Sequence, residues 1–175
     1  MVQQDAGLNP LCLTDSGGDY FRWVNQSQLN EASWKSFDSY ALVRNPWDRV
    51  VSWWAYLEKE RMEFRDFVMG EPWNKGTNQI WVHGLPCSYW THQNGKQLIR
   101  NILRFEYFHQ SAKTILAAAG IPDAKVSVQN QTDRGPYLDY YDDETRDKVA
   151  EMYKDDIALF GYEFGKDKSA TSRSF

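Results

Sequence analysis

The chain has 175 residues, of which 42% are hydrophobic and 15% aromatic, and its formal net charge is −4. This length fits one domain with its own hydrophobic core, so we expect residues 1–175 to form a single domain. The negative net charge excludes the global basic field that attracts DNA, RNA or a membrane surface, and we expect no nucleic-acid or membrane partner.

The sequence lacks the patterns typical of secreted, membrane-spanning and zinc-binding proteins. Its two cysteines, Cys12 and Cys87, are far apart, and its three histidines have no metal-ligand spacing. The first residues show no basic and then apolar signal pattern, and no apolar run approaches about 20 residues, the length of a membrane span. We therefore expect a cytoplasmic protein with reduced thiols and no metal.

The segment before residue 39 predicts little regular structure. Residues 1–20 are polar and contain a Gly-Gly pair, which is typical of a loop. A short helix is predicted over 27–36, where Ser27 is a suitable N-cap. Residues 39–43 are apolar in their second half and are followed by Arg-Asn-Pro, which predicts a short buried strand.

A helix is predicted directly after this strand. Asn45 is a good N-cap, Pro46 suits the first helical position, and Asp48 lies in the first turn beside the positive end of the helix dipole. Ser52 and Tyr56 share the polar side with Asp48. The opposite side carries an apolar stripe at helical spacing, formed by Trp47, Val50, Val51, Trp54 and Leu57.

The second half of the chain predicts further strand and helix segments. Residues 70–95 hold six glycines and prolines and an unusual number of aromatic side chains, which indicates mostly loop. A second strand is predicted over 98–105, a helix over 109–119 that ends at Gly120, and a last helix over 143–158. Strands followed by helices predict an α/β domain with a partly parallel sheet.

The point where the first strand meets its helix has the features of an anion site. A helix N-terminus offers main-chain N–H groups, and Arg44 adds a guanidinium that can bind phosphate through two hydrogen bonds. Ser52, about two helical turns later, can add a hydroxyl. Ligands of open α/β sheets bind at these carboxyl ends of strands. The residues alone leave an alternative open, in which Arg44 pairs with Asp48 and Ser52 is a surface hydroxyl.

The segment VRNPWDRVVSWW resembles the second nucleotide-binding motif of the PAPS-dependent sulfotransferases, in particular the branch that sulfates carbohydrates. Two later segments resemble the same branch in the same order, YWTHQNGKQLIRNILRFEYF (89–108) and NQTDRGPYLDYYDDETRDKVAEMYKDDIALFGYEF (130–164). The resemblance covers 39–164. It implies a three-layer α/β fold related to the P-loop NTPases, with 3′-phosphoadenosine 5′-phosphosulfate (PAPS) as donor, adenosine 3′,5′-bisphosphate (PAP) as product and a carbohydrate hydroxyl as acceptor.

The resemblance also implies residues for one end of the donor. In that family, a strand-ending arginine and a serine eight residues later hold the 3′-phosphate, and these roles fall on Arg44 and Ser52. Arg134, beside Gly135, is a further candidate for contact with the donor phosphates, and a solvated loop charge is the alternative.

A general base cannot be assigned. Glu106 at a strand end and His83 and His92 in the aromatic loop are candidates; the alternatives are a carboxylate paired with Arg100 or Arg104, and surface histidines. Three tryptophans are candidates for stacking on the sugar rings of an acceptor, with core or interface packing as the alternative. They are Trp73, Trp81 and Trp90.

The sequence departs from the family at the other end of the donor. A first strand and a loop with Pro-Lys-Thr or Pro-Lys-Ser hold the 5′-phosphosulfate in the family, but nothing in residues 1–38 fits this loop, and the first lysine is Lys35. We therefore expect a missing or degenerate N-terminal strand-loop-helix unit. The alternative function is a truncated or degenerate domain that binds PAP, PAPS or a protein partner without turnover. The strand edge left by such a loss favours a homodimer.

Overall fold

The computed structural model describes residues 38–57, 59–70, 84–126 and 132–166, together with two short strands, β1 (Leu13–Thr14) and β2 (Phe21–Arg22). Strands β1 and β2 pair antiparallel. The helix predicted over 27–36 and most of the loop predicted over 1–20 lie outside the described residues.

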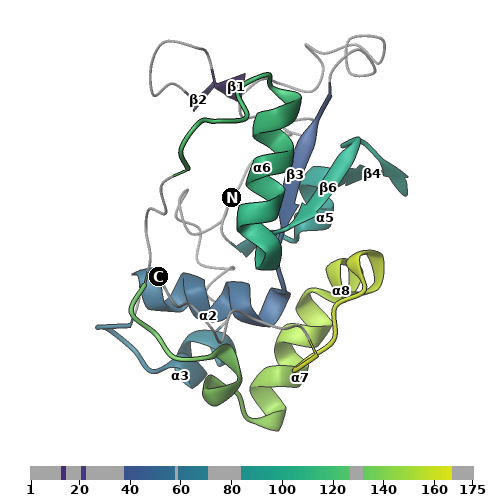
Figure 1. Ribbon diagram of the computed structural model, residues 1–175. Helices are drawn as coiled ribbons and strands as arrows, with labels where there is room; N and C mark the ends of the chain where they lie inside the picture. Colours follow the sequence, from purple (N-terminus) through teal and green to yellow (C-terminus); the bar gives the residue numbers. More distant parts are fainter. Residues whose placement is uncertain are drawn as a thin grey trace.

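The centre of the described fold is a parallel pair of strands, β3 (Tyr40–Val43) and β6 (Asn101–Arg104). Tyr40 pairs with Asn101 and Val43 with Arg104, so the carboxyl ends of both strands meet at one edge (Figure 1). The predicted strands 39–43 and 98–105 and the predicted parallel pairing are confirmed, although the second strand is shorter than its apolar run.

Helix α2 (Pro46–Leu57) begins where β3 ends, as its capping signals predict. The side-chain oxygen of Asn45 accepts hydrogen bonds from the main-chain N–H groups of Trp47, at 2.9 Å, and Asp48, at 3.3 Å. The predicted apolar stripe is buried except for Leu57, which is partly buried, and Trp53 is buried beside it. Trp53, which was not part of the predicted stripe, packs edge-on against Phe67 of α3 (Phe64–Met69), with ring centroids 5.0 Å apart.

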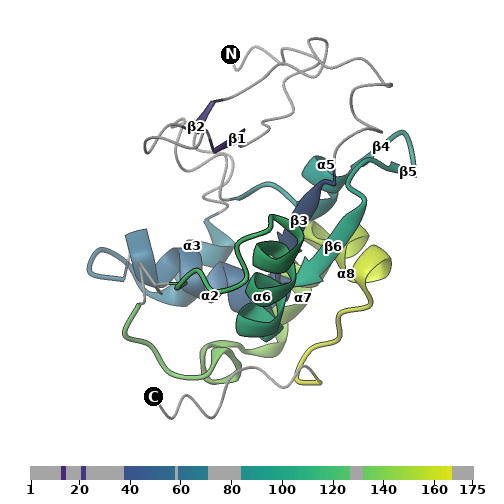
Figure 2. The ribbon, with the colours of Figure 1, turned by 45° about the horizontal axis from the view of Figure 1, so that its top comes forward.

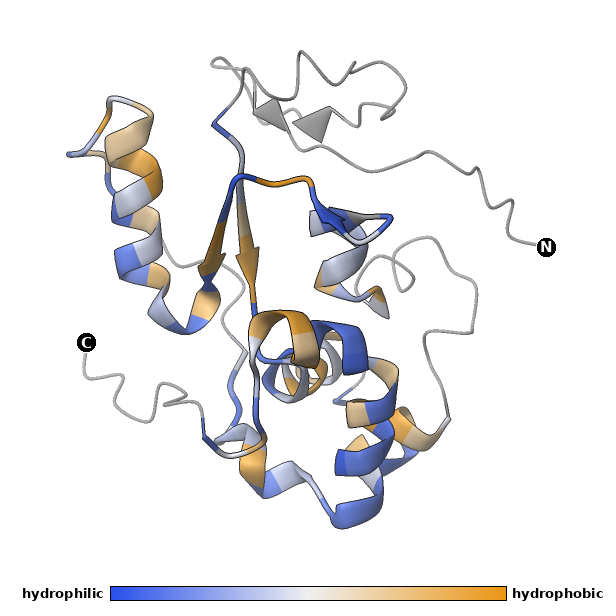
Figure 3. Cartoon of the chain, turned by 90° about the vertical axis from the view of Figure 1, so that its right-hand side faces the viewer, coloured by the Kyte–Doolittle hydropathy of each residue, from blue (hydrophilic) through white to orange (hydrophobic). Residues whose placement is uncertain are grey.

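Helices cover both faces of the parallel pair. Helix α6 (Phe108–Ala118) lies on one face, and α5 (Cys87–Thr91) lies on the other (Figures 2 and 3). A short 3-10 turn, η3 (Phe105–Tyr107), joins β6 to α6. The described elements therefore form the helix–sheet–helix layers expected of a three-layer α/β domain.

Part of the region predicted as loop over 70–95 is regular structure. After Pro86 the chain forms α5, and then a tight hairpin of β4 (His92–Gln93) and β5 (Lys96–Gln97). Asp156 stabilises the start of α5, because its carboxylate accepts hydrogen bonds from the main-chain N–H groups of Cys87, at 2.6 Å, and Ser88, at 2.7 Å. This distant partner is not visible in the local sequence.

The C-terminal segment contains a 3-10 turn, η4 (Tyr137–Tyr140), and two helices, α7 (Asp143–Met152) and α8 (Lys154–Phe160). The prediction of a single helix over 143–158 is wrong, because the helix is interrupted at Tyr153. The Tyr153 ring is 1% exposed, and its hydroxyl donates to the carbonyl of Gly84 at 2.9 Å. This contact holds Tyr153 in the core, outside the regular helical path.

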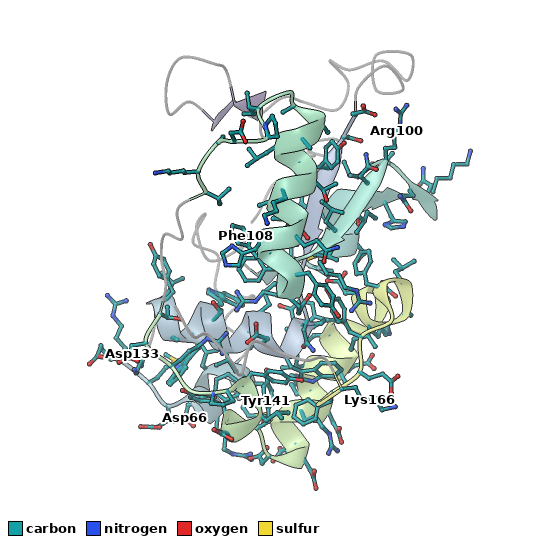
Figure 4. The ribbon with its side chains drawn as sticks, viewed as in Figure 1. Asp66, Arg100, Phe108, Asp133, Tyr141 and Lys166 are labelled. Carbon is teal, nitrogen blue, oxygen red and sulfur yellow. The ribbon has the colours of Figure 1, made fainter. Side chains whose placement is uncertain are left out.

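The described hydrophobic core lies mainly below the sheet, where α2 packs against α3, α7 and η4 (Figure 1). Tyr141, labelled in Figure 4, closes this region by donating its hydroxyl to the carbonyl of Trp47 at 2.9 Å. Among the described residues, no helix combines the length and the apolar character needed to cross a membrane.

Candidate functional site

The position of Arg44 is set by both parallel strands. Arg44 directly follows β3, and its Nε donates to Oδ2 of Asp48 at 2.7 Å, while its Nη2 lies 2.7 Å from the same oxygen. The guanidinium also lies over the ring of Phe105, 4.6 Å from the ring centroid. Because Phe105 follows β6, the two strand ends together orient Arg44.

Asp48 also binds a second cation, the guanidinium of Arg134, beside Arg44. Its other carboxylate oxygen, Oδ1, accepts a hydrogen bond from Nη2 of Arg134 at 2.5 Å, although the two residues are 86 positions apart in the sequence. The Arg134 side chain is only 9% exposed. The two arginines predicted as phosphate contacts, Arg44 and Arg134, therefore converge on one carboxylate, and we call these three side chains the Arg–Asp–Arg cluster.

The cluster holds two cations and one anion. Burial favours the neutral form of Asp48, but Arg44 and Arg134 outweigh it and hold the pKa of Asp48 below its ordinary value of 3.8. Burial lowers the pKa of Arg44, although Asp48 opposes this effect. Arginine stays charged at physiological pH. The cluster therefore carries one excess positive charge in a setting that is largely removed from water.

Ser52 lies beside the cluster on α2. It is partly buried, and it follows Asp48 by four residues on an unbroken helix. Residues at this spacing share one face of a helix, with about 5–6 Å between their Cβ atoms. The three predicted donor-binding residues, Arg44, Ser52 and Arg134, are thus gathered around Asp48.

The main-chain N–H groups at the start of α2 are already hydrogen-bonded within the protein. The N–H of Asn45 donates to Oε1 of Glu106 at 2.6 Å, and Pro46 has no N–H. The next two N–H groups, of Trp47 and Asp48, donate to the Asn45 side chain. The positive character of this strand end therefore comes from side chains, whereas the sequence also predicted a contribution from open N–H groups.

Glu106, a candidate base, holds the strand ends together. Its Oε2 accepts a hydrogen bond from the Tyr162 hydroxyl at 3.3 Å, in addition to the bond from Asn45. Arg100, labelled in Figure 4, pairs instead with Asp38 at the opposite end of β6, with 2.6 Å between Nη1 and Oδ1. A role of Glu106 in proton transfer stays a prediction.

Of the other predicted residues, Trp90 lies in α5 and His92 is the first residue of β4. The Oγ1 of Thr91 and the Nδ1 of His92 are 2.9 Å apart, and the ring of Trp90 packs edge-on against Tyr89 with centroids 4.7 Å apart. His83, Trp73 and Trp81 lie outside the described residues. The roles of these residues in proton transfer and acceptor binding stay predictions.

A buried polar contact made by Arg49, on α2 itself, was not predicted from the sequence. Nη1 of Arg49 donates to the Cys87 sulfur at 3.0 Å, and its guanidinium lies 4.7 Å from the centroid of the Tyr153 ring. Burial raises the pKa of the Cys87 thiol, although Arg49 opposes this effect. Arg49 lies five residues after Arg44, but nothing in the local pattern indicated its partners. Within the described ranges, no three His, Cys, Asp or Glu side chains gather as they would around a metal.

One comparison with known protein families gave a match. A family model described as the sulfotransferase family matches residues 18–163, a range that includes Arg44, Ser52 and Arg134. Comparisons with curated proteins and with solved structures gave no match.

Proposed function

Because the chain belongs to the sulfotransferase family, we propose that it transfers a sulfuryl group from PAPS to a hydroxyl group of a carbohydrate. In this reaction the acceptor oxygen forms a bond to sulfur, and the bond between sulfur and the bridging phosphate oxygen breaks. The hydroxyl proton passes to a base, and PAP leaves. The protein contributes mainly by positioning the reactants and balancing charge.

The observation that carries the proposal is the convergence of Arg44 and Arg134 beside Ser52. Asp48 contacts the Nε and Nη2 atoms of Arg44. A guanidinium has five N–H groups, so donors remain on Arg44 for a phosphate. We assign the 3′-phosphate of PAPS to Arg44, Ser52 and Arg134.

The charge of the cluster fits this assignment. Within the cluster, two guanidinium groups face one carboxylate, which leaves one excess positive charge, although the carboxylate of Glu106 also interacts electrostatically with Arg44. A phosphate monoester carries about −1.5 to −2 charge at neutral pH. Because the three side chains are largely removed from water, such an anion is attracted more strongly here than at an exposed surface.

The carbohydrate acceptor rests on the resemblance over 89–108 and 130–164 rather than on the cluster. Aromatic rings provide flat apolar faces that suit the C–H surfaces of sugars. Trp90 and its neighbour Tyr89, whose ring is 42% exposed, are the described residues that we assign to such stacking. Trp73 and Trp81 are assigned to the same role from the sequence.

Calorimetric titration with PAP tests the donor site. We expect wild-type protein to bind PAP, Arg44→Ala to bind it about ten- to a hundredfold more weakly, and Ser52→Ala to show a smaller loss. AMP, which lacks the 3′-phosphate, should bind both variants as it binds wild type. Arg65→Ala is a matched control, because Arg65 forms exposed ion pairs with Asp142 and Glu144.

The outcomes separate the parts of the proposal. Absence of PAP binding by the wild type would reject the donor site, and equal PAP affinity of wild type and Arg44→Ala would reject the role of Arg44. Incubation with PAPS carrying labelled sulfate and a panel of oligosaccharides then tests transfer. Binding of PAP without transfer would favour the second candidate, a domain that binds the nucleotide without turnover, which the departure in residues 1–38 also supports.

A further inference from the structure

We infer that Asp48 is a positioning residue of the proposed 3′-phosphate site, where it recruits Arg134 and holds the two guanidinium groups side by side. This inference rests on the proposed function. It assigns to a carboxylate, which would by itself repel phosphate, the role of assembling the cations that bind it.

The geometry of the carboxylate supports this role. Oδ2 of Asp48 binds Arg44 at 2.7 Å, and Oδ1 binds Arg134 at 2.5 Å, so each oxygen serves one arginine. The three side chains are 17%, 14% and 9% exposed for Arg44, Asp48 and Arg134. A carboxylate that bridges two largely buried guanidinium groups fixes the distance between them.

Arg134 depends on Asp48 more than Arg44 does. Arg44 is also held by its position at the end of β3 and by the ring of Phe105. Arg134 lies in a segment without helix or strand, and its other described hydrogen bond is to its neighbour Gly135, at 3.4 Å. Asp48 is thus the side chain that orients the Arg134 guanidinium.

The backbone around Arg134 has separate anchors. Nζ of Lys59 donates to the carbonyl of Asp133 at 2.8 Å, and the N–H of Gly135 donates to the Tyr140 hydroxyl at 3.1 Å. These bonds do not involve Asp48. A change at Asp48 is therefore expected to release the Arg134 side chain while the segment itself stays in place.

Electrostatics gives the reason why Asp48 must be charged. Two guanidinium groups that are largely removed from water repel each other: burial is the main cause of the lowered pKa of Arg44, and the nearby charge of Arg134 lowers it further. Asp48 offsets this repulsion. With a neutral residue at position 48, Arg134 gains by turning toward water, and the site keeps one cation instead of two.

A double-mutant cycle on PAP affinity tests the inference. We expect Asp48→Asn and Arg134→Ala each to weaken PAP binding about tenfold or more, and the double variant to bind no more weakly than either single variant. Asp48→Glu should recover part of the affinity, because a carboxylate is restored. AMP affinity should stay constant throughout, which a general structural defect would not produce.

Asp142→Asn is the matched control, since it replaces an exposed carboxylate that pairs with Arg65. If wild type binds PAP but Asp48→Asn binds it equally well or more tightly, Asp48 competes with phosphate and the positioning role is wrong. Additive losses in the double variant would also overturn it. If Asp48→Asn does not fold, the PAP affinity of Arg134→Ala tests the inference instead. An unchanged affinity in this variant would show that Arg134 does not bind the phosphate, and the positioning role of Asp48 would be rejected. Failure of the wild type to bind PAP would instead reject the proposed function.

Discussion

The carboxylate of Glu106 accepts a hydrogen bond from the main-chain N–H of Asn45 at 2.6 Å, across 61 positions of sequence. Asn45 follows the end of β3 by two residues, and Glu106 lies in η3 just after β6, so this bond joins the carboxyl ends of the two parallel strands. Arg44 lies next to Asn45 in the sequence. The bond therefore helps to hold the strand end from which the Arg–Asp–Arg cluster is built.

Replacement of Glu106 separates its structural role from a role in proton transfer. Glu106→Ala leaves the buried N–H of Asn45 without its acceptor, which we expect to lower the free energy of unfolding by about 1–3 kcal/mol. Glu106→Gln keeps an acceptor oxygen and should cost less. Urea unfolding measures both effects. A Glu106→Ala variant as stable as wild type would contradict the bracing role, whereas loss of transfer in a stable Glu106→Gln variant would support Glu106 as the base.

The Asn45 side chain caps α2 and can be tested in the same way. Asn45→Ala removes the acceptor for the N–H groups of Trp47 and Asp48, and we expect a loss of about 1 kcal/mol in the free energy of unfolding. Asn45→Ser restores a capping oxygen and should recover part of this loss. An Asn45→Ala variant as stable as wild type would show that the cap contributes nothing measurable.

The packing between α2 and α3 predicts a large difference between two aromatic substitutions. Phe67 is 1% exposed and packs on Trp53, whereas Tyr56 on the outer side of α2 is 55% exposed. Phe67→Ala should lower the free energy of unfolding by about 3–5 kcal/mol, because it leaves a cavity in the core. Tyr56→Ala should change it by less than about 0.5 kcal/mol. Chemical denaturation of the two variants checks this, and similar losses would contradict the observed core.

The lowered pKa of Asp48 predicts a pH dependence of stability. Since Arg44 and Arg134 hold this pKa below 3.8 in the folded protein, Asp48 stabilises the fold above about pH 4, and this contribution is lost as the pH falls through the lowered pKa. Asp48→Asn has no such group. The difference in free energy of unfolding between wild type and Asp48→Asn should therefore be largest at neutral pH and shrink below about pH 4. Urea titrations from pH 7 to pH 3 measure it, and a difference that does not change with pH would refute the assignment.

Some of this fold could be predicted from local signals. Asn45 and Pro46 define the start of α2 because capping and proline geometry act within one helical turn. The spacing of apolar residues in α2 indicates its buried face, since that face follows the helical period. The family resemblance, which the match over 18–163 confirms, also depends on ordered motifs in the sequence.

Other features depend on which distant residues meet. The break at Tyr153 interrupts a segment with good helical signals, because its hydroxyl bonds to Gly84 and its ring enters the core. Arg134 looked like a solvated loop charge or a phosphate contact, with no local reason to choose. Only the tertiary structure shows that its guanidinium donates a hydrogen bond to the carboxylate of Asp48.

By itself, the sequence determined the two parallel strands, the start of α2, the membership of the sulfotransferase family and the two residues, Arg44 and Ser52, that its motif assigns to the 3′-phosphate. The tertiary structure decided how the site is assembled: Asp48 bridges Arg44 and Arg134, and Glu106 satisfies the N–H of Asn45. The physical reason is the range of the interactions involved. Capping and helical periodicity act between neighbours, whereas ion pairs among buried side chains form only after packing has brought separate segments together and removed the water between them.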